Sequence, residues 1–243
     1  RLYLEKISYQ DRYHCKTTYD VFCHAADEYP SDIAIVEHVT AARDEVAQQL
    51  TFISLANKIN QTANLFRSFG VERSDVISIL LPNMSETHLS IWASQAVGIA
   101  NPINYLLQVE HIVEILNEVK SKVLVTVSLD ETTELGKKVH EIIKGVPSLE
   151  QVLLVDNSVT EISNKQVTVT DFNSAISTQS SDRLAQPFQP KGDDIAMYFH
   201  TGGTTGRPKI AKLSHDNISF VVQVYAGFNA YHGKSAVLNA LPL

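Results

Sequence analysis

The most informative stretch for the architecture is Asp75-Val76-Ile77-Ser78-Ile79-Leu80-Leu81, a nearly continuous apolar run that ends at Pro82. Such a run is typical of a strand in a parallel sheet, because helices cover both faces of the sheet and the alternation with polar residues is lost. The segments 122–127 and 152–155 have the same character. Amphipathic segments with a 3.6-residue spacing separate these runs. Strands that alternate with helices predict βαβ units and a largely parallel sheet.

Local signals extend this pattern in both directions along the chain. Thr18 is suited to cap a helix that runs to about Tyr29, and Thr51 precedes an amphipathic helix with Gly70 just after its end. Further helices are expected at about 85–97, 109–119, 131–143 and 216–227. Further strands are expected at 33–36, 195–199 and 236–241. The predicted fold class is therefore α/β, with mixed, largely parallel sheets flanked by helices.

Two subdomains are expected within the 243 residues. Residues 177–194 are rich in Ser, Gln and Pro, which is typical of a surface connection. We therefore expect a first α/β subdomain over residues 1–176, a linker over 177–194 and the start of a second subdomain over 195–243. The chain begins without Met and stops within an apolar stretch at Leu243. We expect it to be a fragment of a longer protein.

The overall composition excludes several classes of protein. Lys and Arg number 20 against 27 Asp and Glu, a net charge of −7, which argues against a nucleic-acid partner or an anionic membrane surface. No apolar run approaches the roughly 18 residues that a membrane-spanning helix needs. Cys15 and Cys23 lack the spacing of zinc ligands, and no protein-held metal site is expected. The low cysteine content favours a reducing, cytoplasmic compartment.

The clearest chemical signature is the stretch Thr201-Gly202-Gly203-Thr204-Thr205-Gly206-Arg207-Pro208-Lys209. Three of the ten glycines fall within it, interleaved with hydroxyls, and residues 201–215 carry three Lys or Arg and no acid. Glycines let backbone N–H groups approach an anion, hydroxyls donate to phosphate oxygens, and Lys adds positive charge. The stretch predicts a phosphate-binding loop, and a flexible surface hairpin with incidental charge is the alternative.

Two common nucleotide-binding motifs are absent from this stretch. A Walker A loop requires Gly-Lys-Ser or Gly-Lys-Thr at its end, whereas Gly206 is followed by Arg207 and Pro208. The dinucleotide-binding pattern G-x-G-x-x-G is not matched either. These differences argue against ordinary P-loop NTPases and Rossmann dehydrogenases.

The loop resembles the signature of the adenylate-forming (AMP-binding) superfamily, [ST]-[SG]-G-[ST]-T-G-x-P-K, which includes acyl-CoA synthetases, luciferases and the adenylation domains of peptide synthetases. Segments similar to other family motifs occur in the family's order along nearly the whole chain, at 51–57, 70–83, 98–104, 212–217 and 241–243. The resemblance implies the N-terminal portion of the family's large domain.

Two positions depart from the usual signature. Gly202 stands where many members have Ser, and Ile210 stands where Gly is common after the Lys. His200-Thr201-Gly202-Gly203 is more similar to one set of acyl-CoA synthetases than to luciferases. The resemblance therefore favours the acyl-CoA synthetase branch, that is, the fatty-acid-CoA ligases.

The resemblance implies an ATP-dependent acid–thiol ligase. Members join a carboxylic acid to AMP with release of pyrophosphate and then transfer the acyl group to a thiol, so ATP, Mg²⁺ and CoA are the implied cofactors and co-substrate. It also implies which residues hold the β- and γ-phosphates: Thr201, Gly202, Gly203, Thr204, Thr205, Gly206 and Lys209. The catalytic residues of the family are expected beyond Leu243, so the chain alone is expected to be inactive.

Two histidines flank the loop, and several other side chains are expected to have structural positions only. His200 ends the strand before the loop and His215 begins the helix after it, and both are secondary candidates. Trp92 is expected in the core, Asp193 and Asp194 are expected only to precede a strand, and a set of exposed glutamates is expected on one helix face: Glu110, Glu114 and Glu118.

Two other functions stay open at this point. A non-catalytic module that binds nucleotide or pyrophosphate would carry the same loop, and so would a peptide-synthetase-type adenylation domain, whose acceptor is a carrier protein. The particular acid, the thiol acceptor and the oligomeric state, including a homodimer, are not determined by the sequence.

Overall fold

The computed structural model describes residues 15–40, 42, 44–156, 167–185, 190–201, 209–228 and 235–239. Nine strands and seven helices lie in these ranges. In chain order they are α2 (Thr18–Glu28), β1 (Ile33–Glu37), β2 (Gln48–Thr51), α3 (Phe52–Ser68), β3 (Val76–Leu80), α4 (Ser85–Val97), β4 (Ile99–Pro102), α5 (Val109–Glu118), β5 (Ser121–Thr126), α6 (Glu134–Gly145), β6 (Gln151–Leu154), β7 (Thr168–Asp171), α7 (Phe172–Ser177), β8 (Ile195–Thr201), β9 (Lys209–Ser214) and α8 (His215–Phe228).

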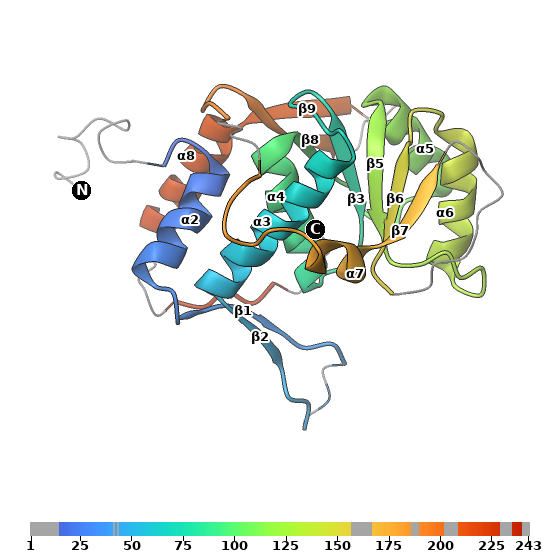
Figure 1. The fold of residues 1–243 in the computed structure, drawn as a ribbon. Coiled ribbons are helices and arrows are strands. Elements are labelled where there is room, and N and C mark those ends of the chain that lie inside the picture. The colour runs from blue at the N-terminus through green and yellow to red at the C-terminus, as the bar shows by residue number, and fades with distance from the viewer. Residues whose placement is uncertain are drawn as a thin grey trace.

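A seven-stranded sheet forms the centre of the molecule, in the order β7-β6-β5-β3-β4-β8-β9 (Figure 1). Every neighbouring pair is parallel except β8 and β9, which are antiparallel. All five residues of β3 are buried, as the continuous apolar run in its sequence predicts. The structure confirms the α/β class with a largely parallel sheet.

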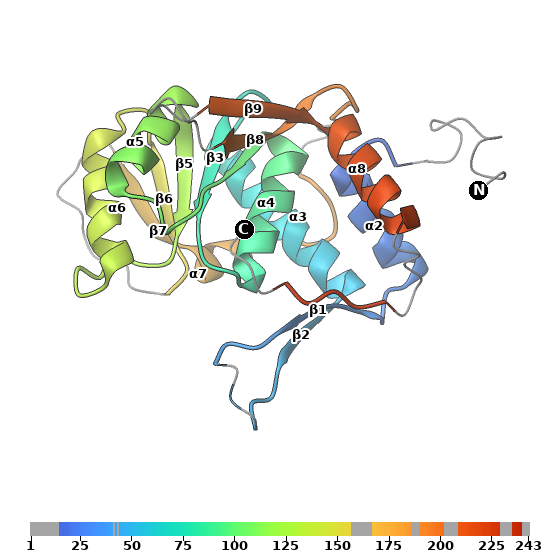
Figure 2. The ribbon, with the colours of Figure 1, turned by 180° about the vertical axis from the view of Figure 1, so that it is seen from behind.

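Helices cover both faces of this sheet, with α3, α4 and α7 on one side and α5 and α6 on the other (Figures 1 and 2). Neighbouring strand residues point to opposite faces. Ile77, Ile79 and Val125 therefore pack in the core under α3 and α4, whereas Leu80 and Leu124 pack under α5 and α6. Two apolar cores thus hold the sheet in place.

Helix α2 begins one residue earlier than predicted. The hydroxyl of Thr17, and not that of Thr18, accepts a hydrogen bond from the backbone N–H of Asp20 (3.1 Å), and the Asp20 carboxylate accepts one from the Thr17 N–H (3.0 Å). This reciprocal capping box needs an acid three residues after the cap, which favours Thr17 over Thr18. Thr51 caps α3 and Gly70 follows it with a φ of 70°, as predicted. The helix expected at about 131–143 begins later, at Glu134, because the Thr133 hydroxyl caps α6 by accepting from the Gly136 N–H.

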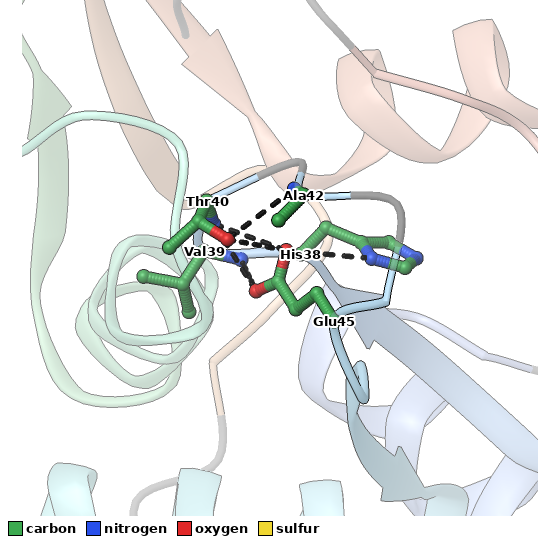
Figure 3. Close-up of polar contacts among 5 residues, drawn as sticks. All are labelled: His38, Val39, Thr40, Ala42 and Glu45. Carbon is green, nitrogen blue, oxygen red and sulfur yellow. Dashed lines mark hydrogen bonds and ion pairs between the residues drawn. The ribbon is translucent and has the colours of Figure 1, made fainter.

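A separate two-stranded hairpin, β1 and β2, projects from the helices (Figure 1). The carboxylate of Glu45 stabilises the connection between β1 and β2 (Figure 3). Glu45 accepts hydrogen bonds from the Val39 N–H (2.5 Å), the Thr40 N–H (3.1 Å) and the Thr40 hydroxyl (3.0 Å), and its Oε2 lies 3.8 Å from Nδ1 of His38. These contacts satisfy backbone donors of the turn, so we assign Glu45 a structural role.

The segment after α7 runs along α3 and is held there by amide side chains. Asn64 donates to the carbonyls of Ser180 (2.8 Å) and Arg183 (2.9 Å) and accepts from the N–H of Ala185 (2.7 Å). Asn60 donates to the carbonyl of Ser181 (2.8 Å). Beyond this segment, β8 and β9 extend the same sheet that β3–β7 form. The subdomain boundary at 177–194 stays a prediction.

The predicted strand at 236–241 is wrong for the part that the structure describes, because residues 235–239 form no regular element. Val237 and Leu238 are 67% and 92% exposed. A strand requires a neighbouring strand with free backbone groups, and within the described ranges none pairs with this segment.

None of the described helices is both long enough and apolar enough to span a membrane.

Candidate functional site

The predicted phosphate loop connects β8 to β9 at one edge of the main sheet. Residues 202–208 lie outside the described residues. Five of the predicted phosphate-binding residues are therefore not described: Gly202, Gly203, Thr204, Thr205 and Gly206. The flanking residues Thr201 and Lys209 are described. Because β8 runs parallel to β4, the loop leaves the sheet at the edge where the parallel strands have their carboxyl ends. Open α/β sheets bind their ligands at this edge.

Thr201 and Lys209 lie directly opposite each other in the antiparallel pair. The Thr201 hydroxyl donates to the Lys209 carbonyl oxygen at 3.4 Å, and both residues are exposed. Directly opposite residues of an antiparallel pair project to the same face of the sheet. The structure therefore brings these two predicted site residues together, on one face and at the start and end of the loop.

The register of β8 defines which residues share that face. Side chains alternate along a strand, so Met197 and Phe199 lie on the face of Thr201, and Tyr198 and His200 lie on the opposite face. The surroundings agree with this assignment. Met197 and Phe199 contact a cavity bordered by helices, whereas Tyr198 lines a different recess at the other face.

His200 lies next to the loop but faces away from Thr201. It pairs with Ile210, and its Nδ1 is buried without a hydrogen-bond partner among the described residues. Burial lowers the pKa of the His200 imidazole, so the ring is neutral at neutral pH. A contribution of His200 to phosphate binding stays a prediction, and the direction of its side chain, away from Thr201, does not support it.

His215 lies at the opposite end of β9 from Lys209. His215 is six positions after Lys209, or about 20 Å along an extended strand. His215 is 1% exposed, and its Nδ1 accepts a hydrogen bond from the Thr18 N–H (3.3 Å). The Thr18 hydroxyl in turn donates to Oε1 of Gln95 (2.7 Å). Burial lowers the pKa of His215 to about 4. A neutral His215 thus links α8 to α2 and α4, and the structure does not bring it to the loop.

Asp194, the second of the two aspartates before β8, has structural contacts. Asp194 forms an ion pair with Arg73, and its Oδ2 accepts a hydrogen bond from the Lys191 N–H (2.6 Å). Its carbonyl oxygen accepts one from the His215 N–H (3.1 Å), which fixes the start of α8. Across the described part of the chain, no group of three or more His, Cys, Asp or Glu side chains could hold a metal ion.

One feature of the structure was not predicted from the sequence: an apolar cavity of about 550 Å³. It lies on the Thr201 face of β8, among α2, α4 and α8. Trp92, which was expected in the core, is partly buried there and lines the cavity, with its ring centroid 4.2 Å from that of Phe22. The alternation along β8 predicts which of its side chains share a face of the sheet. It does not predict the cavity, because the cavity depends on how three helices distant in sequence pack together.

Comparisons with known proteins agree with the loop and the fold. The sequence model of the AMP-binding enzyme family matches residues 22–243. The marinolic acid–CoA ligase of Pseudoalteromonas sp. (strain SANK 73390) is 32% identical over 212 residues, which are 87% of this chain and 31% of that protein. The long-chain-fatty-acid–CoA ligase of Bacillus subtilis (strain 168) is 25% identical in an alignment of 246 positions, gaps included, that covers 93% of this chain and 42% of that protein.

Among solved structures, a long-chain-fatty-acid–CoA ligase from Archaeoglobus fulgidus matches with a TM-score of 0.77 at 19% identity, covering 95% of this chain and 43% of that one. This likeness shows the fold. The family model over residues 22–243 and the 32% identity to a CoA ligase mean that the chain belongs to the AMP-binding enzyme family, as the loop signature implied. The chain spans less than half the length of each of these relatives.

Proposed function

We propose that this chain is the phosphate-binding part of an ATP-dependent acyl-CoA synthetase. The observation that carries the proposal is the loop sequence 201–209 in a member of the AMP-binding enzyme family, since its described ends, Thr201 and Lys209, lie at the carboxyl end of the parallel strand β8. In the proposed reaction a carboxylate oxygen attacks the α-phosphorus of ATP, the bond to the β-phosphate breaks, and acyl-AMP and pyrophosphate form. A CoA thiol then displaces AMP from the acyl carbon.

In this proposal the loop acts on the leaving group. Thr201 to Gly206 and Lys209 hold the β- and γ-phosphates, since backbone N–H groups, hydroxyls and one ammonium group stabilise the charge that pyrophosphate carries away. Lys209 is exposed on the face of Thr201, where its side chain is free to reach a polyphosphate. Mg²⁺ would be held by phosphate oxygens and by a hydroxyl such as that of Thr201, because it prefers hard oxygen ligands and keeps few protein contacts.

We also propose that the 243-residue chain does not complete the ligase reaction by itself. It spans 31% and 42% of the two CoA ligases named above, so most of the length of such enzymes has no counterpart here. The synthetase function is therefore tested in a longer form of the protein that includes these 243 residues. The assay measures acid-dependent exchange of labelled pyrophosphate into ATP.

Lys209→Ala should lower the exchange rate by about 10²-fold, since the loss of one preorganised charge-stabilising donor has about this effect. Lys212→Ala is the matched control. Lys212 lies on the same strand but on the opposite face, with its Nζ 5.8 Å from the centre of the Tyr198 ring, and its loss should change the rate by less than about threefold.

Equal losses in the two variants would reject the role of Lys209. Pyrophosphate binding with no exchange for any acid would favour the non-catalytic module. Exchange followed by acyl transfer to a carrier protein, and not to CoA, would favour a peptide-synthetase-type adenylation domain.

A further inference from the structure

The sulfur atom of Met197 can be reached from solvent. Met197 lies on β8, four positions before Thr201, and lines the apolar cavity among α2, α4 and α8 (Figures 1 and 2). Its side chain is partly buried against the core under α3 and α4. Phe199 and Val222 line the same cavity and are 43% and 53% exposed, so the cavity opens to solvent. Small polar solutes can therefore enter it.

The neighbour of this sulfur is the side-chain amide of Gln95, on α4. Gln95 is 3% exposed, and its Oε1 accepts a hydrogen bond from the Thr18 hydroxyl at 2.7 Å. That bond fixes the orientation of the amide, because Oε1 is held at Thr18 and the NH₂ group is left to face Met197. Nε2 of Gln95 lies 3.9 Å from Sδ of Met197. A thioether is a weak acceptor, so a stronger acceptor at the sulfur would stabilise this buried donor.

Oxidation of the sulfur would provide such an acceptor. The sulfur lone pair attacks one oxygen of hydrogen peroxide, the O–O bond breaks, and hydroxide leaves with the bonding pair. The hydroxide then takes the proton of the new S–OH group and becomes water, so the sulfur is oxidised by two electrons and the peroxide is reduced. The product is methionine sulfoxide, which carries a polar S=O oxygen. In the cavity wall, this oxygen would lie beside the N–H donor of Gln95.

We propose that Met197 is a site of oxidation by peroxides, and that the oxygen of its sulfoxide accepts a hydrogen bond from the Gln95 amide. Oxidation of a core methionine usually disrupts packing, because a polar group enters an apolar environment. Here a buried donor already faces the sulfur, so the new oxygen is paired when it forms. The bond links β8 to α4 four positions before Thr201. The site does not depend on the proposed ligase activity.

Met84 is a matched reference for Met197. It is the other of the two methionines in the sequence and is partly buried against the same core. It precedes α4, and its side chain makes no capping hydrogen bond to that helix. Both side chains are intermediate between buried and exposed, so a difference in their oxidation rates reports more than access to the oxidant.

Peptide mass spectrometry after brief treatment of the folded 243-residue chain with hydrogen peroxide measures both sites in one sample. Met197 should be oxidised about threefold or more faster than Met84, because the Gln95 donor stabilises the oxygen as it becomes bound to sulfur. In the chain unfolded by urea the two rates should be equal. Gln95→Leu should abolish the difference, and thermal unfolding shows whether this variant is folded.

A second measurement observes the hydrogen bond itself and does not depend on the folding of Gln95→Leu. In NMR spectra of Met84→Leu, in which Met197 is the one methionine, peroxide should move the signal of the Gln95 side-chain amide proton downfield. In Met197→Leu the same treatment should leave that signal in place.

Oxidation of Met197 at the same rate as Met84, or more slowly, in the folded chain would overturn the proposal. An unchanged ratio of the two rates in a folded Gln95→Leu variant would do the same, and so would a Gln95 amide signal that does not move when Met197 is oxidised. Faster oxidation of Met197 that is lost with Gln95, together with the downfield shift, would support it.

Discussion

At the scale of single residues, His215 makes stability depend on pH. Its pKa is lowered to about 4 by burial, against an ordinary value near 6.5, so the folded protein holds this ring neutral. Asp20 and Asp216 favour the charged ring, and Arg73 opposes it. A lowered histidine pKa means that the unfolded chain binds the proton more readily. The stability from the neutral ring is therefore complete above about pH 6.5 and is lost as the pH falls toward 4.

We expect His215→Asn to remove this dependence, because an Asn oxygen can accept from the Thr18 N–H but does not titrate. Between pH 7 and pH 4, the unaltered chain should lose up to about 3 kcal/mol more unfolding free energy than the variant does. Urea unfolding at several pH values measures the difference. Parallel curves for the two proteins would show that His215 does not titrate in this range.

Single residues also show the limit of reading a site from sequence. His200 and His215 flank the phosphate loop in the sequence and were equally reasonable candidates. In the structure, one faces away from Thr201 and the other lies at the far end of β9. Strand alternation directs His200 to the face opposite Thr201, and burial between helices holds His215 away from the loop. Which face and which helices these are depends on tertiary packing.

At the scale of elements, the junction between α4 and β4 requires glycine. A Cβ at Gly98 would lie 2.8 Å from the Asp75 carbonyl oxygen and 3.1 Å from Cδ1 of Ile77. The Gly98 N–H also donates to the Ser94 carbonyl oxygen at 2.7 Å, so the turn has little room to shift. Close approach of the helix end to β3 therefore excludes a side chain here.

Gly98→Ala should lower the free energy of unfolding by about 1–3 kcal/mol, which is typical of overpacking. Gly70 offers a contrasting control. A Cβ there would meet nothing within 4 Å, and only the φ of +70° opposes a side chain, so Gly70→Asn should cost little. Thermal and urea unfolding would compare the two. A Gly98→Ala variant as stable as the unaltered chain would contradict the close approach.

Most elements were predictable because local signals and burial agree. The continuous apolar run of β3, the cap at Thr51 and the span of α4 all follow from short-range patterns. Two errors differ in origin. The cap at Thr17 has a local signal, Asp20 three residues later, and it was overlooked, whereas 235–239 is irregular because no strand among the described residues pairs with it.

At the scale of the whole molecule, the parallel sheet brings the ends of distant segments to one edge. The loop 201–209 was recognisable from its sequence, because its chemistry is contained in nine consecutive residues. The cavity was not, because its lining comes from α2, α4, β8 and α8, which span most of the chain. Only the fold shows that Met197, Phe199 and Thr201 connect the two features along one face.

The central claim is that the loop between β8 and β9 binds the pyrophosphate part of ATP, and calorimetric titration of the 243-residue chain with Mg²⁺-pyrophosphate tests it most directly. We expect one binding site, with an affinity lowered about 10-fold or more by Lys209→Ala, because a hydrogen bond from a charged group is worth about 1.5–3 kcal/mol. Lys212→Ala should leave the affinity unchanged. Undetectable binding, or equal affinities for the Lys209→Ala and Lys212→Ala variants, would contradict it.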